Sequence, residues 1–396
     1  MKILHVIPSL SPDSGGPAQV AMNLVSSLRK LGVDAEIATT NHNSVGLLDV
    51  PTNERTEYVF DVANELSCPV WFLPYTNPSL KEFIFSMPLT GWLWKNLSSY
   101  DVIDNHYLFS YAPTCAAAIA RAQKIPYTVR TMGQLTPWAL SQSALKKKLY
   151  ATVIERRNLS KASVIHCTSD QETVNVREFG ISAPTETIPL GVNAPKKIEG
   201  ARKKLRNNYD IPEEVPVFLF LSRIHCKKRP ELLLKAAAEF LRKQPCHIIF
   251  AGTGETHYVE SLQRLSEELE ISNHVTFAGF VTGCSKDLLL QGADAFVLPS
   301  FSENFGIAVA EALISGLPVV LTPGIHISKE IKEADAGLVV DGEEGALCSA
   351  LEKLTQHDRL RDNLIKNGLQ LAQTRYSWAS IAQNLSSVYE SIASKE

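Results

Sequence analysis

The strongest constraint on the fold is a repeated alternation of short apolar runs with segments of helical character. In the first half of the chain, helix-like segments at about 17–31, 112–122 and 138–160 separate the runs "KILHVIP", "DAEIATT", "DVIDNH", "PYTVRTM" and "ASVIHCTS". Continuous apolar runs of this length are typical of strands that are buried on both faces. The pattern therefore predicts a parallel, doubly wound α/β sheet.

The same alternation starts again near residue 215. Strand-like runs "VPVFLFLSRI", "HIIFAGTG", "HVTFAGF", "DAFVLPS" and "PVVLTP" alternate with helix-like segments at about 230–243, 256–270 and 303–316. A chain of 396 residues that is 45% hydrophobic can fill two cores of this kind. We therefore predict two domains, 1–193 and 194–375. The Pro- and Gly-rich segment "TIPLGVNAPKKIEG" would join them, and a final helix over about 376–396 would pack back on the first.

Composition removes several classes of protein. The net charge of -3 argues against a general nucleic-acid binder. The seven cysteines contain no C-x-x-C pair, which predicts reduced thiols in a cytoplasmic protein. The opening "MKILHVIPSL" is too short for a signal-peptide core, and no run reaches 18 apolar residues. We expect a protein that is soluble or peripheral to a membrane.

Two glutamates lie eight positions apart in "FSENFGIAVAEALISGLPVV", residues 301–320. The alanines predict a helix from about Gly306 to Ser315, which the following Gly316 would end. Glu303 would then lie in the loop before this helix, and Glu311 on a mostly buried face. An unpaired carboxylate there is costly, so either a nearby lysine or backbone amide, or a ligand, is expected to satisfy Glu311. The window alone leaves both alternatives open.

Candidate anion-binding groups follow strands. In "FLSRIHCKKRPELLLKA", Arg223 comes directly after a strand and Lys228 lies just before a helix, where this fold would meet a diphosphate. A solvated basic loop is the alternative. Gly15 and Gly16 in "PSLSPDSGGPAQV" precede a helix whose amides can face an anion, although a tight turn explains them equally well. His106 ends a strand and is a candidate to face the ligand cleft, although a lone histidine is more often a structural group with satisfied hydrogen bonds.

Other chemistries have no matching motif. The sequence lacks D-x-D, G-x-x-x-x-G-K-[ST], H-E-x-x-H and G-x-S-x-G, and its glycines do not complete a dinucleotide fingerprint. We therefore expect neither a bound metal nor a resident cofactor, and we exclude an NAD-dependent oxidoreductase.

The chain carries Arg223, Lys228, "AGTGE", "FAGF", "IPLGVN" and E-N-F-G-I-x-V-x-E-A-L-x-x-G-x-P-V-V. Together these residues and motifs resemble the retaining glycosyltransferase family 4, which has the GT-B fold. The resemblance covers nearly the whole chain and implies two Rossmann-like domains that bind a nucleotide-diphosphate sugar as donor. It implies that Glu311 binds ribose hydroxyls, that Glu303 binds the sugar, and that the two cations bind the diphosphate. The remaining donor contacts that it implies are Gly15, Gly16, Phe280, Val281, Asn304, Phe305, Gly306 and Ile307.

The resemblance implies a retaining transferase that moves a hexose-type sugar to a glycan or lipid-linked glycan in polysaccharide biosynthesis. Two fixed cations can stabilise the departing diphosphate, so no metal is needed. The expected catalytic residues are Glu303, Arg223, Lys228 and His106. Two alternatives are another GT-B enzyme, such as a nucleotide-sugar epimerase or a phosphorylase, and a non-catalytic nucleotide-sugar-binding protein.

One position departs from the family pattern. Members often carry a histidine, sometimes an arginine, in the loop that corresponds to "YTVRTMGQLTPWAL", and Met132 stands there in this chain. Arg130 and His106 are the candidates to replace it.

Residues 121–161 carry nine basic side chains and one acidic one, a net charge of +8. With Trp138, Leu145, Trp92 and Trp94 nearby, this segment predicts contact with an anionic membrane surface. A solvated helix face is the alternative.

Overall fold

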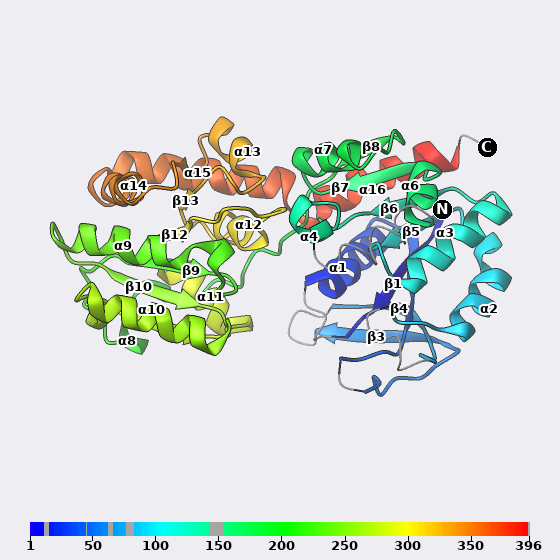
Figure 1. Ribbon diagram of the computed structural model, residues 1–396, viewed down its shortest axis with the longest axis horizontal. Helices are drawn as coiled ribbons and strands as arrows, with labels where there is room; N and C mark the ends of the chain where they lie inside the picture. Colours follow the sequence, from blue (N-terminus) through cyan, green and yellow to red (C-terminus); the bar gives the residue numbers. More distant parts are fainter. Residues whose placement is uncertain are drawn as a thin grey trace. The chain divides into compact units, whose positions relative to one another are not determined.

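The computed structural model describes residues 1–11, 16–44, 46–61, 66–76, 83–141, 150 and 154–394. The chain divides into two compact units (Figure 1). The first unit comprises Met1–Gly191 and Trp378–Glu396, and the second comprises Val192–Ser377. Within the described residues, no helix is both long and apolar enough to cross a membrane.

The first unit is built on an eight-stranded sheet in the order β3-β4-β2-β1-β5-β6-β7-β8. Its strands are β1 (Lys2–Ser9), β2 (Asp34–Thr40), β3 (Arg55–Asp61), β4 (Leu66–Leu73), β5 (Val102–His106), β6 (Tyr127–Arg130), β7 (Val164–Cys167) and β8 (Thr185–Thr187). All neighbouring pairs are parallel except β3 and β4. The predicted parallel sheet is therefore corrected at this edge, where β3 is too exposed to show a continuous apolar run.

Helices flank this sheet. They are α1 (Gly16–Lys30), α2 (Met87–Asn96), α3 (Tyr111–Gln123), α4 (Pro137–Ser141), α6 (Arg156–Ser160) and α7 (Asp170–Glu178). The helix-like segment expected over 138–160 is represented by α4 and α6, and residues 142–149 and 151–153 between them lie outside the described residues.

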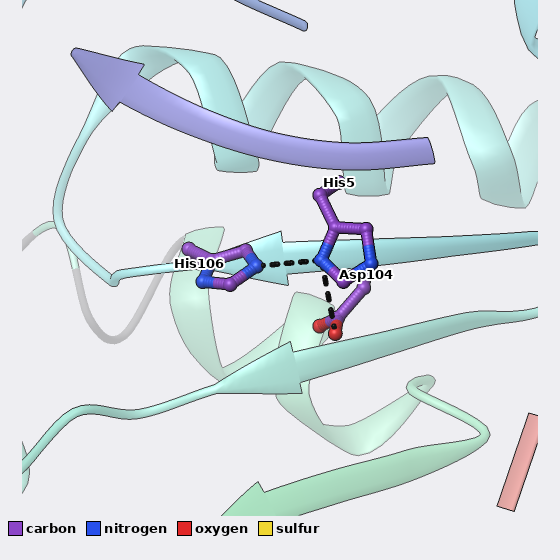
Figure 2. A group of neighbouring side chains, drawn as sticks. All are labelled: His5, Asp104 and His106. Carbon is purple, nitrogen blue, oxygen red and sulfur yellow. Dashed lines mark hydrogen bonds and ion pairs between the residues drawn. The ribbon is translucent and has the colours of Figure 1, made fainter. Parts of the chain in front are cut away.

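The chain returns to the first unit through α16 (Trp378–Ala393), which packs against α1 and β5. Tyr389 on α16 is fully buried, and its hydroxyl donates to Asp104 of β5. The same carboxylate oxygen lies 2.8 Å from Arg130 Nη2 and 3.5 Å from His5 Nδ1. His5 Nδ1 is 3.0 Å from His106 Nε2 (Figure 2). One buried carboxylate thus connects three strands to the last helix.

Burial determines the charges in this cluster. It lowers the pKa of His5 to about 4, that of His166 to about 3, and that of His106 well below its ordinary value, so the rings are neutral at pH 7. Burial alone would raise the pKa of Asp104, but Arg130, His106 and His5 together outweigh it and hold this pKa below its usual range. The cluster is therefore a single ion pair among neutral imidazoles, and removing one partner would leave a buried charge.

The second unit has a six-stranded parallel sheet in the order β11-β10-β9-β12-β13-β14. Its strands are β9 (Val217–Leu221), β10 (His247–Ala251), β11 (Val275–Gly279), β12 (Ala295–Leu298), β13 (Val319–Leu321) and β14 (Leu338–Val339). Its helices are α8 (Ala201–Asn208), α9 (Pro230–Leu241), α10 (Thr256–Glu268), α11 (Gly283–Gly292), α12 (Ile307–Ile314), α13 (Ser328–Glu333), α14 (Glu344–Gln356) and α15 (Asp358–Arg375).

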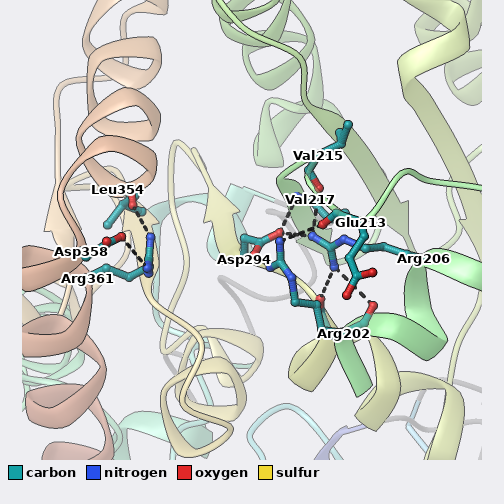
Figure 3. Close-up of polar contacts among 10 residues, drawn as sticks. Arg202, Arg206, Glu213, Val215, Val217, Asp294, Leu354, Asp358 and Arg361 are labelled. Atoms are coloured by element: carbon teal, nitrogen blue, oxygen red, sulfur yellow. Dashed lines mark hydrogen bonds and ion pairs between the residues drawn. The ribbon is translucent and has the colours of Figure 1, made fainter. Parts of the chain in front are cut away.

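Asp294 closes the amino ends of β9 and β12 (Figure 3). Its carboxylate is 2.5 Å from Arg206 Nη2, accepts from the Val217 amide at 2.7 Å and pairs with Arg202. Arg206 also donates to the Val215 carbonyl at 2.9 Å. Burial lowers the pKa of Arg206 to about 10, which leaves it charged at pH 7. The network fixes α8 to the amino end of the sheet and leaves the carboxyl end to the loops.

The contact between Tyr389 and Asp104 can be tested by stability. We expect Tyr389→Phe to lower the free energy of unfolding by about 1–3 kcal/mol, because Asp104 loses one hydrogen bond in a site that water does not reach. Tyr376→Phe is the matched control: Tyr376 is also buried and its hydroxyl donates to Glu330 at 2.7 Å, but that carboxylate is 28% exposed and water can replace the bond. Denaturant unfolding of both variants measures the difference. Equal losses of unfolding free energy in the two variants would contradict the claim that the buried hydrogen bond to Asp104 contributes more to stability.

Candidate functional site

The loops that follow β9, β10, β11 and β12 meet at the carboxyl edge of the second sheet, because these strands are parallel. The first two loops touch directly: the Ile224 amide donates to the Thr253 carbonyl at 2.8 Å. A Cβ added at Gly254 would lie 2.1 Å from the Ile224 carbonyl oxygen, so only glycine permits this approach. The backbone therefore fixes the loop that carries the two predicted cations.

Arg223 and Lys228 lie in that loop. Arg223 is exposed just beyond β9, whereas Lys228 is buried at the end of a 3-10 turn, Cys226–Lys228, and forms an ion pair with Glu303. Burial, with smaller effects of the neighbouring Lys227 and Arg223, lowers the pKa of Lys228 to about 7. The Glu303 carboxylate acts in the opposite direction and favours the charged ammonium. Lys228 is thus a buried cation whose charge responds to its partners near neutral pH.

Glu303 lies in the loop before α12, as the sequence predicts. Its amide donates to the Gly324 carbonyl at 3.0 Å, and its carbonyl accepts from the His326 amide at 3.1 Å, so its backbone is held on both sides. Helix α12 begins after Gly306, whose φ of 86° lies in the left-handed region that favours glycine. The Val309 and Ala310 amides donate to the Gly306 carbonyl at 2.8 and 3.4 Å, and the amides before them lie at the helix N-terminus, which suits an anion. Asn304 and Phe305 lie in this loop, Gly306 caps α12 and Ile307 begins it, and their backbone contacts with a donor stay a prediction.

Glu311 lies in the second turn of α12, with 22% of its side chain exposed. Its carboxylate is 2.7 Å from the ammonium of Lys286 on α11. The prediction of a mostly buried face holds for Val309, Ala310 and Ala312 but is corrected for Glu311 itself. The sequence left a lysine partner as one of the alternatives for Glu311, and the structure shows this lysine. No local pattern identifies Lys286, because it lies on a different helix. A pair this exposed contributes little stability, so it does not oppose a ligand strongly.

Phe280 directly follows β11 and is 76% exposed, an unusual state for a large aromatic side chain. Val281 beside it is half-buried. Their position at the same edge as Arg223 gives a flat apolar surface that can contact a planar ring.

In the first unit, Gly16 is the first residue of α1, and Gly15 lies outside the described residues. His106 ends β5 as predicted, but its side chain is completely buried against His5. The expectation that it faces an open cleft is therefore corrected, because its ring is part of the Asp104 cluster. Arg130, the other candidate to replace the family histidine, is 2% exposed and committed to Asp104.

The loop that contains Met132 has an unusual backbone. Met132 has a φ of 51° and Gly133 a φ of 75°, and left-handed geometry at a non-glycine residue is strained. The fully buried Glu172 holds this loop by accepting from the Thr131 hydroxyl and the Gly133 amide, each at 2.5 Å. Sequence reasoning missed Glu172. Its only signal is the capping-box spacing from Ser169, which caps α7.

Among the described residues, His5, Asp104 and His106 have ligand atoms close enough together to hold a metal ion. The guanidinium of Arg130 already lies 2.8 Å from the Asp104 oxygen that such an ion would need. A fixed cation there repels a second one, so the group is better explained as an ion-pair network.

The family comparisons match both halves of the chain. Residues 15–191 match the family described as "Glycosyl transferase 4-like domain", and residues 201–371 match "Glycosyl transferases group 1". The D-inositol 3-phosphate glycosyltransferase of Corynebacterium urealyticum is 26% identical, covering 96% of this chain and 91% of the relative. That of Corynebacterium glutamicum is 24% identical, covering 99% and 96%.

Solved structures agree on the fold. Anabaena HepE in complex with UDP has a TM-score of 0.77 at 20% identity, covering 99% of this chain and all of HepE. Sucrose-phosphate synthase from Thermosynechococcus elongatus has a TM-score of 0.74 at 19% identity, covering 100% of both chains. The predicted fold class is thereby confirmed, and the chain belongs to glycosyltransferase family 4, with the GT-B fold.

Proposed function

We propose that this glycosyltransferase moves a hexose-type sugar from a nucleotide-diphosphate donor to an acceptor hydroxyl, with retention of anomeric configuration and without a metal. The ion pair between Lys228 and Glu303 carries the proposal. This pair brings Lys228, which we propose binds the diphosphate, into contact with Glu303, which we propose binds the sugar, at the carboxyl ends of β9 and β12. A donor that spans these two groups would have its scissile bond between them.

The comparisons support the donor class. HepE of Anabaena was solved with UDP-glucose as well as with UDP and glucose. In this chain we assign the diphosphate to Arg223 and Lys228, the ribose to Glu311, and the base to the surface of Phe280 and Val281. UDP-glucose is therefore the first donor to test.

The proposed chemistry needs stabilisation of a leaving group. As the bond to the sugar breaks, negative charge grows on the diphosphate, and two fixed cations in a partly dry site stabilise it. The sugar ring gains positive character, which the nearby carboxylate of Glu303 favours. The departing phosphate takes the acceptor proton when attack comes from the same face, so no separate base is required.

For the acceptor we propose a glycan or lipid-linked glycan, reached at the cytoplasmic face of a membrane. The relatives named for D-inositol 3-phosphate support a second candidate, a phosphorylated cyclitol, which offers the same kind of hydroxyl nucleophile. A nucleotide-sugar sensor would bind the donor without turnover. Release of free nucleoside diphosphate distinguishes the enzyme from the sensor.

The roles of the two cations can be tested by mutation. We expect Arg223→Ala and Lys228→Ala each to lower turnover by an amount equivalent to about 3 kcal/mol, because each removes charge stabilisation from the leaving group. Lys235→Ala, which removes an exposed lysine from α9, is the control and should leave turnover unchanged. EDTA should have little effect. Complete loss of activity in EDTA, with recovery on adding manganese, would contradict the metal-free proposal.

The pKa of Lys228 predicts a pH dependence. Its ammonium form attracts the diphosphate, and a pKa of about 7 means that this form is depleted as the pH rises through 7. Affinity for UDP, measured by calorimetry, should therefore fall between about pH 7.5 and 9, by up to about tenfold per pH unit. Lys228→Arg keeps its charge in this range and should flatten the profile. Identical slopes for the two proteins would exclude Lys228 as the titrating group.

The two glutamates should separate binding from catalysis. Glu311→Gln should weaken binding of both UDP and the nucleotide sugar, because the ribose does not change during transfer. Glu303→Gln should leave UDP affinity unchanged or higher, since it frees Lys228, while lowering the catalytic rate by an amount equivalent to about 2 kcal/mol or more. Calorimetry and saturation kinetics measure these effects.

Lys286→Met is the control for Glu311. If Glu311 binds ribose directly, losing Lys286 releases the carboxylate and UDP affinity is kept. If Lys286→Met weakens UDP binding as much as Glu311→Gln does, Glu311 acts only through its ion pair and the ribose assignment is wrong.

A further inference from the structure

The first unit contains an open pocket of about 750 Å³ at the amino ends of two strands. It is lined by Pro126 and Tyr127 at the start of β6 and by Ser163 just before β7. Residues of helices α3, α6 and α16 also line it. Ligands of doubly wound sheets bind at the carboxyl ends of strands, so this pocket lies at the opposite edge of its sheet from the position expected for substrates.

The walls of the pocket are basic. Arg121, Lys124, Arg157 and Lys161 line it, and none of its lining residues within the described part of the chain is acidic. Within the part of the chain that the structure describes, none of the four forms an ion pair with a carboxylate. Arg121 donates to the Asn158 side chain and lies near the buried carboxylate of Glu155, whereas the other three are exposed.

Part of this charge has a local explanation. Lys124 and Lys161 are the C-terminal caps of α3 and α6, where the helix dipole favours a cation. The C-terminal ends of α3, α6 and α16, whose Ile392 also lines the pocket, each contribute about half a negative charge, and Glu155 contributes one. Four cations therefore leave an excess of roughly one to two positive charges, more than capping requires. This excess and the concave shape fit a phosphate group, which arginine can bind through two parallel hydrogen bonds and lysine as a point charge.

An exposed apolar surface adjoins the pocket. The side chain of Gln123, next to Lys124, donates to the Trp94 carbonyl at 2.8 Å and joins the end of α2 to the end of α3. Trp94 is 59% exposed and Met87 is 61% exposed. These two residues are seven positions apart, so they share one face of α2. Trp92, by contrast, packs against Trp71 with ring centroids 5.1 Å apart. Exposed Trp and Met beside a basic pocket are typical of a surface that enters a lipid interface.

We propose that this pocket binds the phosphate of an anionic lipid headgroup while Trp94 and Met87 enter the membrane interface. The inference deepens the membrane location given under the proposed function and assigns it to particular residues. It does not depend on transferase activity, because the pocket contains none of the donor-site residues. Lys146, Lys147 and Lys148 of the basic segment lie outside the described residues and are not needed for it.

Vesicle co-sedimentation of the full chain tests the proposal. Binding should be strong to vesicles of phosphatidylcholine with phosphatidylglycerol and absent from phosphatidylcholine alone. Replacing Arg157 and Lys161 together by Glu should weaken binding to the anionic vesicles at least tenfold, and Trp94→Ala at least threefold. Lys203→Glu with Lys204→Glu, on the exposed face of α8, makes the same change in net charge and should alter binding less than twofold. Should the pocket double variant fail to fold, Lys124→Glu carries the same prediction.

Each other outcome overturns the proposal. An equal loss in the α8 control would mean that net charge alone attracts the protein. Wild-type binding to glycerol phosphate or inorganic phosphate in calorimetry, without vesicle binding, would assign the pocket to a soluble ligand. Unchanged vesicle binding in the pocket variants would place the contact elsewhere. The pocket variants should also keep their release of UDP from UDP-glucose, so failure of the membrane site and failure of the transferase proposal give different results.

Discussion

The candidate site depends on one geometric constraint: the strands of the second sheet all run in the same direction. Their carboxyl ends therefore lie at one edge, and the loops after β9, β10, β11 and β12 open beside one another. Arg223, Phe280 and Glu303 are far apart in the sequence. Each follows a strand of this parallel sheet, and that alone places them at the same edge. The Asp294 network at the other end of the sheet holds α8 and leaves this edge to the loops.

Charge is arranged differently in the two units. In the first, Asp104 and Arg130 form a fully buried ion pair that connects strands to α16, and its surroundings contain neutral histidines. In the second, the pair of Lys286 with Glu311 is partly open to solvent, whereas Lys228 is buried and its partner Glu303 is 20% exposed. A buried pair is costly to break, whereas a partly exposed pair exchanges partners at little cost. The first arrangement suits a structural role, and the second suits groups that receive a ligand.

The sequence predicts the features that depend on local backbone chemistry. Gly306 and Gly316 mark the two ends of α12, and the position of Glu303 follows from them. The alternation of strands and helices predicts both sheets. Four strands are missed. β3 lies exposed at an edge, β4 contains Pro69, which weakens its strand pattern, and β8 and β14 have only three and two residues.

Features that depend on tertiary contacts cannot be predicted from local sequence patterns. His106 has the position of a site residue, but it is buried against His5 of β1, a contact that no local pattern encodes. The pairing of Lys286 with Glu311 joins two helices. Glu172 accepts hydrogen bonds from the Met132 loop, which lies about forty residues earlier in the sequence. In each case the residue types are visible in the sequence and the partners are not.

The central claim is that the donor binds at the carboxyl edge of the second sheet. Hydrogen–deuterium exchange of the full chain, with and without saturating UDP, tests it most directly. The account predicts slower amide exchange in residues 222–229, 252–255 and 303–311, and no comparable change at the amino ends of β6 and β7. Protection confined to the first unit, or no protection at saturating UDP, would contradict it.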